Sequence, residues 1–206
     1  MFPIMIDLRG QKVVIAGGGP VALHKIENLL RFGIKPHVVS PECHPSIERL
    51  AAAEKVVIHR KKVEWCDLEN AFLIMLVTDD REANARMAEL AVQHGKLVVH
   101  AEHNDLGNAQ IPAVLIRGRL MISVSTGGAS PTLSTQIRNR LEDEFDERYE
   151  DYLDFLFEAR QYIKNNIDAR PERRMWLKKA AESRYLDHPE EREQYMADLL
   201  SRYPGL

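Results

Sequence analysis

The sequence has little cysteine and no long apolar run. Its two cysteines, Cys43 and Cys66, share no metal-site spacing, so we expect neither a disulfide framework nor a zinc knuckle. We read both as packing residues of a reducing compartment. No stretch of 18 apolar residues is long enough to cross a bilayer, and the first residues lack the basic start of a signal peptide. These absences predict a cytoplasmic protein with no membrane partner.

The sequence also lacks a strong charge of either sign. Its net charge is −3 over 206 residues, with 45% hydrophobic and 29% charged residues. This balance is ordinary for a folded domain and does not indicate a nucleic-acid partner. The length suffices for one sizeable core or two modest ones, so we expect a globular protein.

The clearest motif is an apolar run that stops at three glycines and continues as a helix. Residues 13–16 are uninterruptedly apolar, as in a parallel strand that is covered on both faces. Gly17, Gly19 and Ala22 match the Gly-x-Gly-x-x-Gly/Ala pattern of dinucleotide-binding turns. The N–H groups at the following helix start can hold a diphosphate. The alternative is a tight structural turn. We predict cofactor contacts from Gly17, Gly18, Gly19, Pro20 and Val21.

The second predicted strand, residues 36–40, ends without the acidic residue that usually binds the ribose hydroxyls. Ser40 stands near that position, and Pro41 and Glu42 follow, so we expect these three residues to contact the adenosine. No Arg or Lys follows directly to pair with a 2′-phosphate. The sequence therefore favours NAD over NADP as cofactor.

The strand predicted at residues 72–77 is followed by Thr78 and Asp79, at the sheet edge where open α/β sheets bind ligands. We expect both residues to contact the cofactor. Asp79 with Glu82 three residues later also fits a capping box that starts the next helix. The cap and the ligand contact remain open alternatives for Asp79.

Strand and helix signals alternate through residue 112 and then change. Further strands at 56–58 and 97–99, joined by crossover helices, predict a Rossmann-like parallel sheet over residues 1–112. Residues 113–125 predict an antiparallel hairpin that turns at 117–119. Because a lone hairpin is marginal in water, we expect a homodimer through residues 113–145.

The hairpin leads into a helix and then into an all-α region. Ser130 is the expected N-cap, Pro131 stands at the first helical position, and one apolar face carries Leu133, Ile137, Leu141 and Phe145. Residues 146–206 are strongly charged and lack strand signals, with breaks at 170–171 and 187–189. We expect an all-α C-terminal domain whose core and interfaces include Phe155, Tyr162, Met175, Trp176, Tyr185, Tyr195 and Met196.

The best candidate for chemistry is the loop after the strand at 97–99. Residues 100–108 contain two histidines, Glu102 and Asp105, at the ligand-binding edge of the sheet. Either carboxylate could act as a general base, and the loop matches no fixed metal signature. The alternative is structural, since Asn104, Gly107 and Asn108 are common turn formers.

Taken together, several motifs make the sequence similar to the sirohaem-synthesis family. They are Asp7-Leu8-Arg9-Gly10 before the glycine turn, Lys25, Val77-Thr78-Asp79-Asp80, Ile111-Pro112-Ala113 and Ser125-Thr126-Gly127-Gly128-Ala129-Ser130-Pro131. They stand in the family order over residues 1–145. The resemblance implies a Rossmann domain, a dimerisation region and a helical domain. It also implies NAD-dependent oxidation of precorrin-2 to sirohydrochlorin.

The resemblance further implies roles for residues outside the glycine turn. Precorrin-2 carries eight carboxylates, which Arg117, Arg119, Arg138 and the 125–130 loop are suited to bind. Ser125 matches a family serine that is phosphorylated in some relatives; a plain turn hydroxyl is the alternative.

One departure from the family pattern concerns the base. Bifunctional relatives carry Asn-Val-Val-Asp where this chain has Val99-His100-Ala101-Glu102, so Glu102 takes the matching slot and Asp105 is a nearby substitute. This places iron insertion in doubt more than dehydrogenation, and no metal ligand is assigned. Two alternatives remain: a bifunctional enzyme that also inserts ferrous iron, and a non-catalytic NAD(H)-sensing module.

Overall fold

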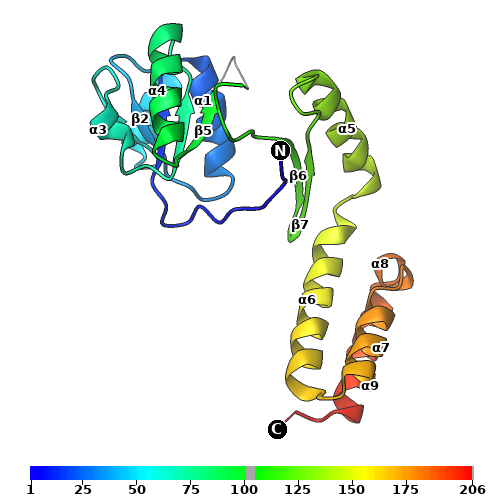
Figure 1. The fold of residues 1–206 in the computed structure, drawn as a ribbon. Helices are drawn as coiled ribbons and strands as arrows, with labels where there is room; N and C mark the ends of the chain where they lie inside the picture. The colour runs from blue at the N-terminus through cyan, green and yellow to red at the C-terminus, as the bar shows by residue number, and fades with distance from the viewer. Residues whose placement is uncertain (101–104, 206) are drawn as a thin grey trace. The chain divides into compact units, whose positions relative to one another are not determined.

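The computed structural model describes residues 1–100 and 105–205 (Figure 1). These residues form two compact units, Met1–Ile111 and Pro112–Leu206. The first unit has apolar clusters on both faces of a sheet, and the second has an aromatic-rich cluster among helices.

The first unit is built on a parallel five-stranded sheet with the order β3-β2-β1-β4-β5. The predicted Rossmann-like sheet is therefore confirmed. Because all strands run in parallel, their carboxyl ends share one edge of the sheet, where such folds bind ligands. The strands are β1 Val13–Ala16, β2 His37–Val39, β3 Val57–His59, β4 Leu73–Leu76 and β5 Leu97–His100.

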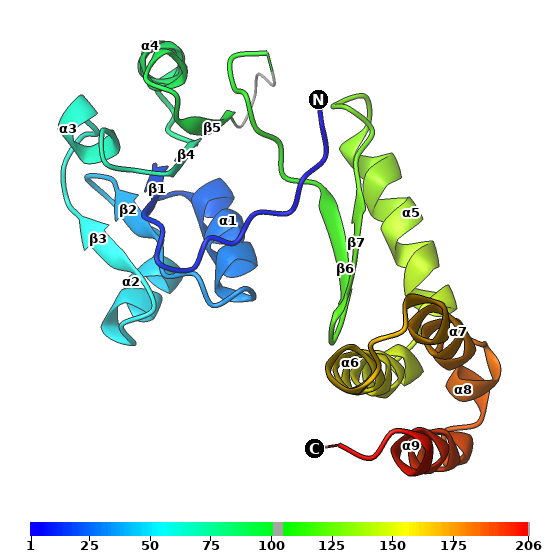
Figure 2. The ribbon, with the colours of Figure 1, turned by 60° about the horizontal axis from the view of Figure 1, so that its bottom comes forward.

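Helices cover both faces of this sheet (Figure 2). Val13 and Ile15 of β1 pack with α1 and α2 on one face. Val14 and Ala16 pack with α3 and α4 on the other. All four β1 residues are fully buried, which explains why the strand sequence is apolar without alternation. The helices are α1 Pro20–Leu30, α2 Pro45–Ala52, α3 Trp65–Leu68 and α4 Arg81–Gln93.

Two details of the first unit differ from the sequence prediction. The short helix α3 was not predicted. It begins with a reciprocal capping box between Glu64 and Asp67. The predicted cap at Asp79 is wrong, because Asp80 is the N-cap of α4 and its carboxylate accepts the Ala83 N–H at 2.9 Å. Adjacent aspartates offer the same side chain, and only the backbone position decides which one caps.

The second unit begins with the predicted hairpin and helix. Strands β6 Ala113–Arg117 and β7 Leu120–Val124 pair antiparallel around Gly118 and Arg119, and α5 spans Pro131–Glu144. The predicted cap is confirmed, since the Ser130 hydroxyl accepts the Leu133 N–H at 3.1 Å. Burial is low in these elements, and Leu133 of the predicted apolar face is 46% exposed.

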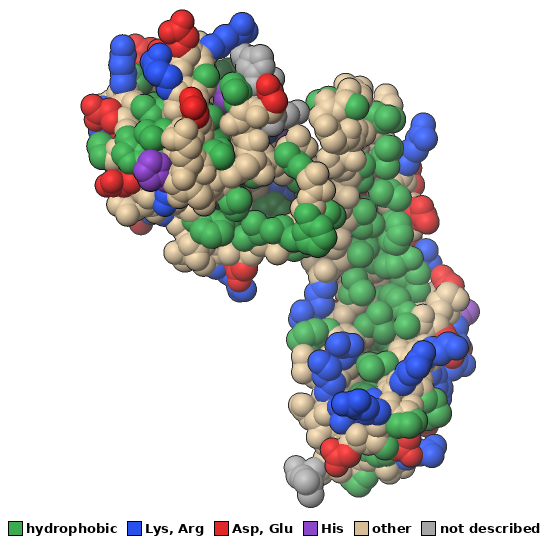
Figure 3. Space-filling view, viewed as in Figure 1, with side chains coloured by type: hydrophobic (Ala, Val, Ile, Leu, Met, Phe, Trp, Pro, Cys, Tyr) green, Lys and Arg blue, Asp and Glu red, His purple; other side chains and the backbone are tan. Residues whose placement is uncertain are grey.

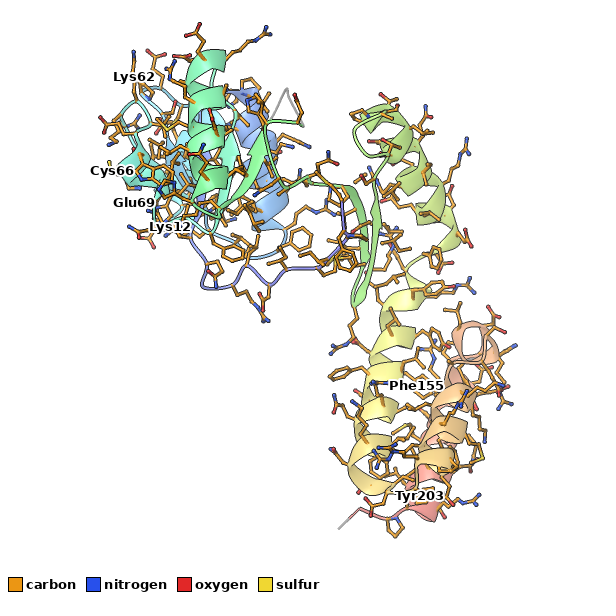
Figure 4. All side chains as sticks on the ribbon, viewed as in Figure 1. Lys12, Lys62, Cys66, Glu69, Phe155 and Tyr203 are labelled. Atoms are coloured by element: carbon orange, nitrogen blue, oxygen red, sulfur yellow. The ribbon has the colours of Figure 1, made fainter. Side chains whose placement is uncertain are left out.

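The rest of the second unit is helical, as predicted. Its helices are α6 Arg148–Asn166, α7 Arg170–Ala180, α8 Arg184–Asp187 and α9 Glu190–Arg202. Phe155, Trp176 and Tyr195 lie buried between them, and the Tyr195 hydroxyl donates to the Trp176 carbonyl at 2.8 Å. Figure 4 labels Phe155 on α6, where it points toward the neighbouring helices. Met175, which the sequence analysis placed among core and interface residues, is 49% exposed and is not part of this core.

Within the described ranges, no helix is both long enough and apolar enough to cross a membrane.

Candidate functional site

At the first two positions of the turn after β1, neighbouring backbone atoms leave no room for a side chain. Gly17 has a φ of +121°, and a Cβ there would lie 2.6 Å from the Val77 carbonyl oxygen at the end of β4. A Cβ on Gly18 would overlap the Glu42 carbonyl oxygen in the loop after β2. The Gly17 N–H also donates to Val39, and the Gly18 carbonyl accepts the His44 N–H at 2.7 Å. These contacts hold the turn against the ends of two neighbouring strands.

The third glycine has a different environment. A Cβ on Gly19 would meet no described residue within 4 Å, so this position is open in the part of the chain that the structure describes. Gly19 is the N-cap of α1, and no side chain among residues 1–100 and 105–205 caps the helix there. An uncapped helix start with N–H groups facing outward is the arrangement that binds phosphate in dinucleotide folds.

The start of α1 also fits the remaining requirements of a dinucleotide turn. Ala22 is fully buried against the sheet, as the small third residue of the motif should be, while Val21 is 52% exposed. Pro20 at the first helical position needs no hydrogen-bond acceptor. Farther along α1, partial burial lowers the pKa of Lys25. The residues present therefore fit a bound diphosphate at the beginning of α1.

The loop after β2 forms the neighbouring wall of this turn. Ser40 is 8% exposed, and its hydroxyl donates to the Glu42 carbonyl at 2.6 Å, while Pro41 and Glu42 are exposed. Cys43 packs on the core, and burial raises the pKa of its thiol, which confirms its predicted packing role. The Ser40 hydroxyl thus fixes the loop after β2. In dinucleotide-binding folds, this loop is the one that contacts the adenosine.

The end of β4 is shaped by a residue that the sequence analysis missed. Asn84, 4% exposed, donates to the Thr78 carbonyl at 2.8 Å, and the Thr78 hydroxyl donates to the Asn84 side-chain oxygen at 2.6 Å. This pair holds the turn beside Gly17, and it leaves Asp79 exposed at the carboxyl edge. An asparagine inside a helix carries no local signal that it will reach back to the preceding strand.

The candidate base loop follows β5 at the same edge of the sheet. Glu102 lies outside the described residues. Asp105 is exposed, and His100 at the end of β5 is 4% exposed. Asp105 belongs to the same unit as the glycine turn, and its role as a base stays a prediction.

The 125–130 loop belongs to the second unit. The Ser125 hydroxyl accepts the Gly127 N–H at 3.1 Å, so it serves as a turn hydroxyl. The Thr126 hydroxyl accepts the Ser130 N–H at 3.0 Å and also lies 3.0 Å from the Ser130 carbonyl, to which it donates. Side chains of the loop itself thus satisfy the start of α5.

The three arginines named for substrate binding differ in their contacts. Arg119 forms a 2.6 Å ion pair with Asp154 and lies over the Phe157 ring at 3.7 Å. Arg138 pairs with Glu142 on its own helix at 3.1 Å. Arg117 forms no ion pair among the described residues; its guanidinium donates to the Ile116 carbonyl at 3.1 Å, and its buried Nε has no hydrogen-bond partner there. Of the three, Arg117 is therefore the one without an acidic partner in the described part of the chain.

Two other features do not coincide with the glycine turn. A cavity of about 530 Å³ on α7 is lined by Arg170, Pro171, Arg174, Met175 and Lys178; Figure 3 shows Lys and Arg side chains on the helical end of the second unit. It contains no predicted site residue.

The second feature is a group of potential metal ligands near α3, formed by Glu64, Cys66 and Asp67. The Lys61 ammonium bonds Glu64 and Asp67 at 2.6 and 3.2 Å and offsets part of their negative charge. These contacts raise the pKa of Lys61. Cys66 is exposed, so its interpretation as a packing residue is wrong.

Three known protein families together match nearly the whole chain. Residues 4–113 match a family described as putative NAD(P)-binding. Residues 117–144 match the central region of sirohaem biosynthesis proteins. Residues 149–195 match a family described as the SirC C-terminal domain.

Curated relatives agree with these matches. The precorrin-2 dehydrogenase of Priestia megaterium is 37% identical over 163 residues, which cover 79% of this chain and 80% of that protein. The precorrin-2 dehydrogenase of Bacillus subtilis strain 168 is 32% identical over 78% of this chain and 99% of its own length. The siroheme synthase of Nitrosococcus oceani is 29% identical, and the match covers 38% of that longer protein.

A solved structure of SirC, a precorrin-2 dehydrogenase, superposes with a TM-score of 0.82 at 32% identity. The match covers 98% of this chain and 100% of that one. The glycine turn, the sheet order and these matches agree. This chain belongs to the precorrin-2 dehydrogenase family of sirohaem-synthesis proteins.

Proposed function

We propose that this protein is an NAD-dependent oxidoreductase that converts precorrin-2 to sirohydrochlorin in sirohaem biosynthesis. The observation that carries this proposal is the uncapped start of α1 at Gly19, which faces open space beside the carboxyl ends of β2 and β4. Relatives matched over most of their length are named precorrin-2 dehydrogenases, which does not favour the chelatase or sensing alternatives. We place the protein in the cytoplasm.

The protein's own groups have two tasks in this reaction. Residues Gly17 to Val21 bind the diphosphate, and Ser40, Pro41, Glu42, Thr78 and Asp79 line the flanking loops. NAD⁺, when bound, accepts the hydride. Breaking the C–H bond sends its electron pair away with that hydride, and an adjacent N–H or C–H of the macrocycle then loses a proton.

The proton requires an acceptor at the same edge of the sheet. Asp105 or Glu102 takes it, or a water molecule held by one of them does. Both belong to the loop after β5, and Asp105 is exposed there. Since hydride and proton are both accounted for, no metal ion or covalent nucleophile is needed.

The substrate offers eight carboxylates, so we propose a largely electrostatic contact with the second unit. Arg117 carries this proposal, because Arg119 and Arg138 already have acidic partners. Residues 125–130 add polar groups from the same unit. We divide the roles among cofactor binding by 1–112, dimerisation by 113–145 and a helical domain at 146–206.

We also propose a homodimer built on the hairpin and α5. In β6, β7 and α5, Leu115 and Ser134 are the buried residues, whereas Met121 and Leu133 are 39% and 46% exposed. A two-stranded sheet with so little buried area needs a further packing partner. A second copy of the same hairpin supplies one by two-fold symmetry.

The decisive test of the activity is spectroscopic. Purified protein mixed with precorrin-2 and NAD⁺ should give the sirohydrochlorin spectrum together with NADH absorbance at 1:1 stoichiometry. NADH binding without any spectral change of the tetrapyrrole would instead indicate a sensing module. Iron incorporation above the protein-free rate would add the chelatase activity.

The test of the dimer is the mass in solution. We expect light scattering to give twice the chain mass for the wild type and the monomer mass for Leu133→Glu. Met175→Glu, an equally exposed position on α7, is the matched control and should stay dimeric. A monomeric wild type would contradict the proposed dimer.

A further inference from the structure

Strand β5 is the last strand of the parallel sheet, so among the described residues only β4 pairs with it as a strand. The outer edge of such a strand presents N–H and C=O groups at every second residue that need other partners. Here the partners come from Asn108 and Ala109, at the end of the candidate base loop.

Asn108 takes the place of a neighbouring strand. Its side-chain oxygen accepts the Val98 N–H at 2.8 Å, and its side-chain NH₂ donates to the Lys96 carbonyl at 2.8 Å. The Asn108 and Ala109 backbone N–H groups both donate to the Val98 carbonyl, at 3.1 and 3.0 Å. Four hydrogen bonds thus attach one short segment to the edge of β5.

Gly107 allows this close approach. A Cβ on Gly107 would lie 2.5 Å from the Val98 carbonyl oxygen and 3.2 Å from the His100 N atom. Both are backbone atoms that cannot rotate away, so any other residue would push the segment off the strand. The preceding residue, Leu106, packs into the cluster on the α4 face of the sheet.

We infer that Gly107 and Asn108 are positioning residues that fix Asp105 at the carboxyl end of β5 for the reaction. Asp105 directly precedes residues 106–109, of which Leu106 and Ala109 pack on the core and Asn108 bonds the strand edge. A carboxylate on a loop can accept a proton efficiently only if its distance to the substrate is held within about an ångström. The inference rests on the proposed function, and it assigns the role of base to Asp105.

The test is a double-mutant cycle on the full-length protein. Asn108→Ala should lower kcat about 10- to 100-fold, as expected for a misplacement of about 1 Å, and leave the KM for NAD⁺ within about twofold. In the Asp105→Asn background the same change should cost no further kcat, because the group that it positions is gone. Asn70→Ala, an exposed asparagine whose amide contacts only Glu69 at 3.5 Å among the described residues, is the matched control and should leave kcat unchanged.

If Asn108→Ala does not fold, two further variants can test the same positioning role. Asn108→Asp retains the acceptor for the Val98 N–H and loses the donor to Lys96, so its kcat should be intermediate. Gly107→Ala should resemble Asn108→Ala, and for both the kcat loss should again vanish beside Asp105→Asn.

The outcomes separate the inference from the activity. Full activity of Asp105→Asn, or losses from Asn108→Ala and Asp105→Asn that multiply, would overturn the positioning role alone. A wild type that fails to oxidise precorrin-2 would overturn the proposed function and this role with it.

Discussion

The molecule contains two glycine-rich loops that each lead into a helix beginning with proline, and they differ in how the helix start is satisfied. At α1 the N-cap is Gly19, which has no side chain and no neighbour within 4 Å of a Cβ. At α5 the N-cap is Ser130, whose hydroxyl accepts the Leu133 N–H. The Thr126 hydroxyl accepts the Ser130 N–H and donates to the Ser130 carbonyl.

The difference shows what distinguishes a binding loop from a structural one. A helix start that is capped by its own sequence has already used the N–H groups that would hold an anion. A helix start without a cap keeps them available, at a cost in stability that a bound phosphate offsets. Both loops are rich in glycine and end at a proline, but the residue before that proline, Gly19 or Ser130, decides whether the helix start is capped.

The largest effect is expected at the open helix start. In Gly19→Asp the new carboxylate would stand against the diphosphate, and a like-charge contact costs several kcal/mol, so NADH affinity should fall about 100-fold or more. The fold should persist, because a Cβ at this position meets nothing. NADH fluorescence titration measures the affinity. Gly19→Ala is the control and should lose little; equal losses in both variants would contradict the charge argument.

Gly18→Ala sharpens the contrast between two adjacent glycines. Its Cβ would overlap the Glu42 carbonyl oxygen, so we expect a loss of about 1–3 kcal/mol in unfolding free energy from overpacking. Denaturant unfolding of Gly18→Ala and Gly19→Ala measures the difference. Equal stability of the two variants would show that the turn is not held against the loop after β2.

At the capped helix start, the expected effect is on stability alone. Ser130→Ala removes the N-cap of α5 and should cost about 1 kcal/mol of unfolding free energy. NADH affinity should stay unchanged, because this loop is already satisfied by its own side chains. A marked loss of NADH affinity in Ser130→Ala would mean that the second loop also holds the cofactor.

The smallest effect is expected for Ser125→Ala. Its hydroxyl accepts one exposed Gly127 N–H, so the stability change should stay within about 0.5 kcal/mol and kcat within about twofold. Steady-state assays with precorrin-2 measure the second quantity. A large drop in kcat would assign Ser125 a direct role in the reaction.

The parts of the fold that the sequence predicts are those set by continuous local patterns. The fully buried β1 is apolar at every position, and the helix after it starts at Pro20, so strand, turn and helix follow from adjacent residues. The Ser130 cap was likewise predictable, because the residue and its helix are neighbours in sequence.

The parts that could not be predicted depend on contacts between separated residues. Asn108 bonds Lys96 and Val98, ten or more positions earlier, and nothing in its own neighbourhood indicates that it replaces a strand. Asn84 reaches back to Thr78 in the same way. Met175 has an apolar side chain but is exposed. Its neighbour Trp176 is on the buried face of the same helix.

The most direct measurement is a crystal structure of the protein with NADH bound. We predict the diphosphate at the beginning of α1, within hydrogen-bond distance of the N–H groups of Gly19, Val21 and Ala22, and the nicotinamide on the side of the loop that carries Asp105. A diphosphate at the beginning of α5, or one held away from Gly19, would contradict the assignment of the cofactor site.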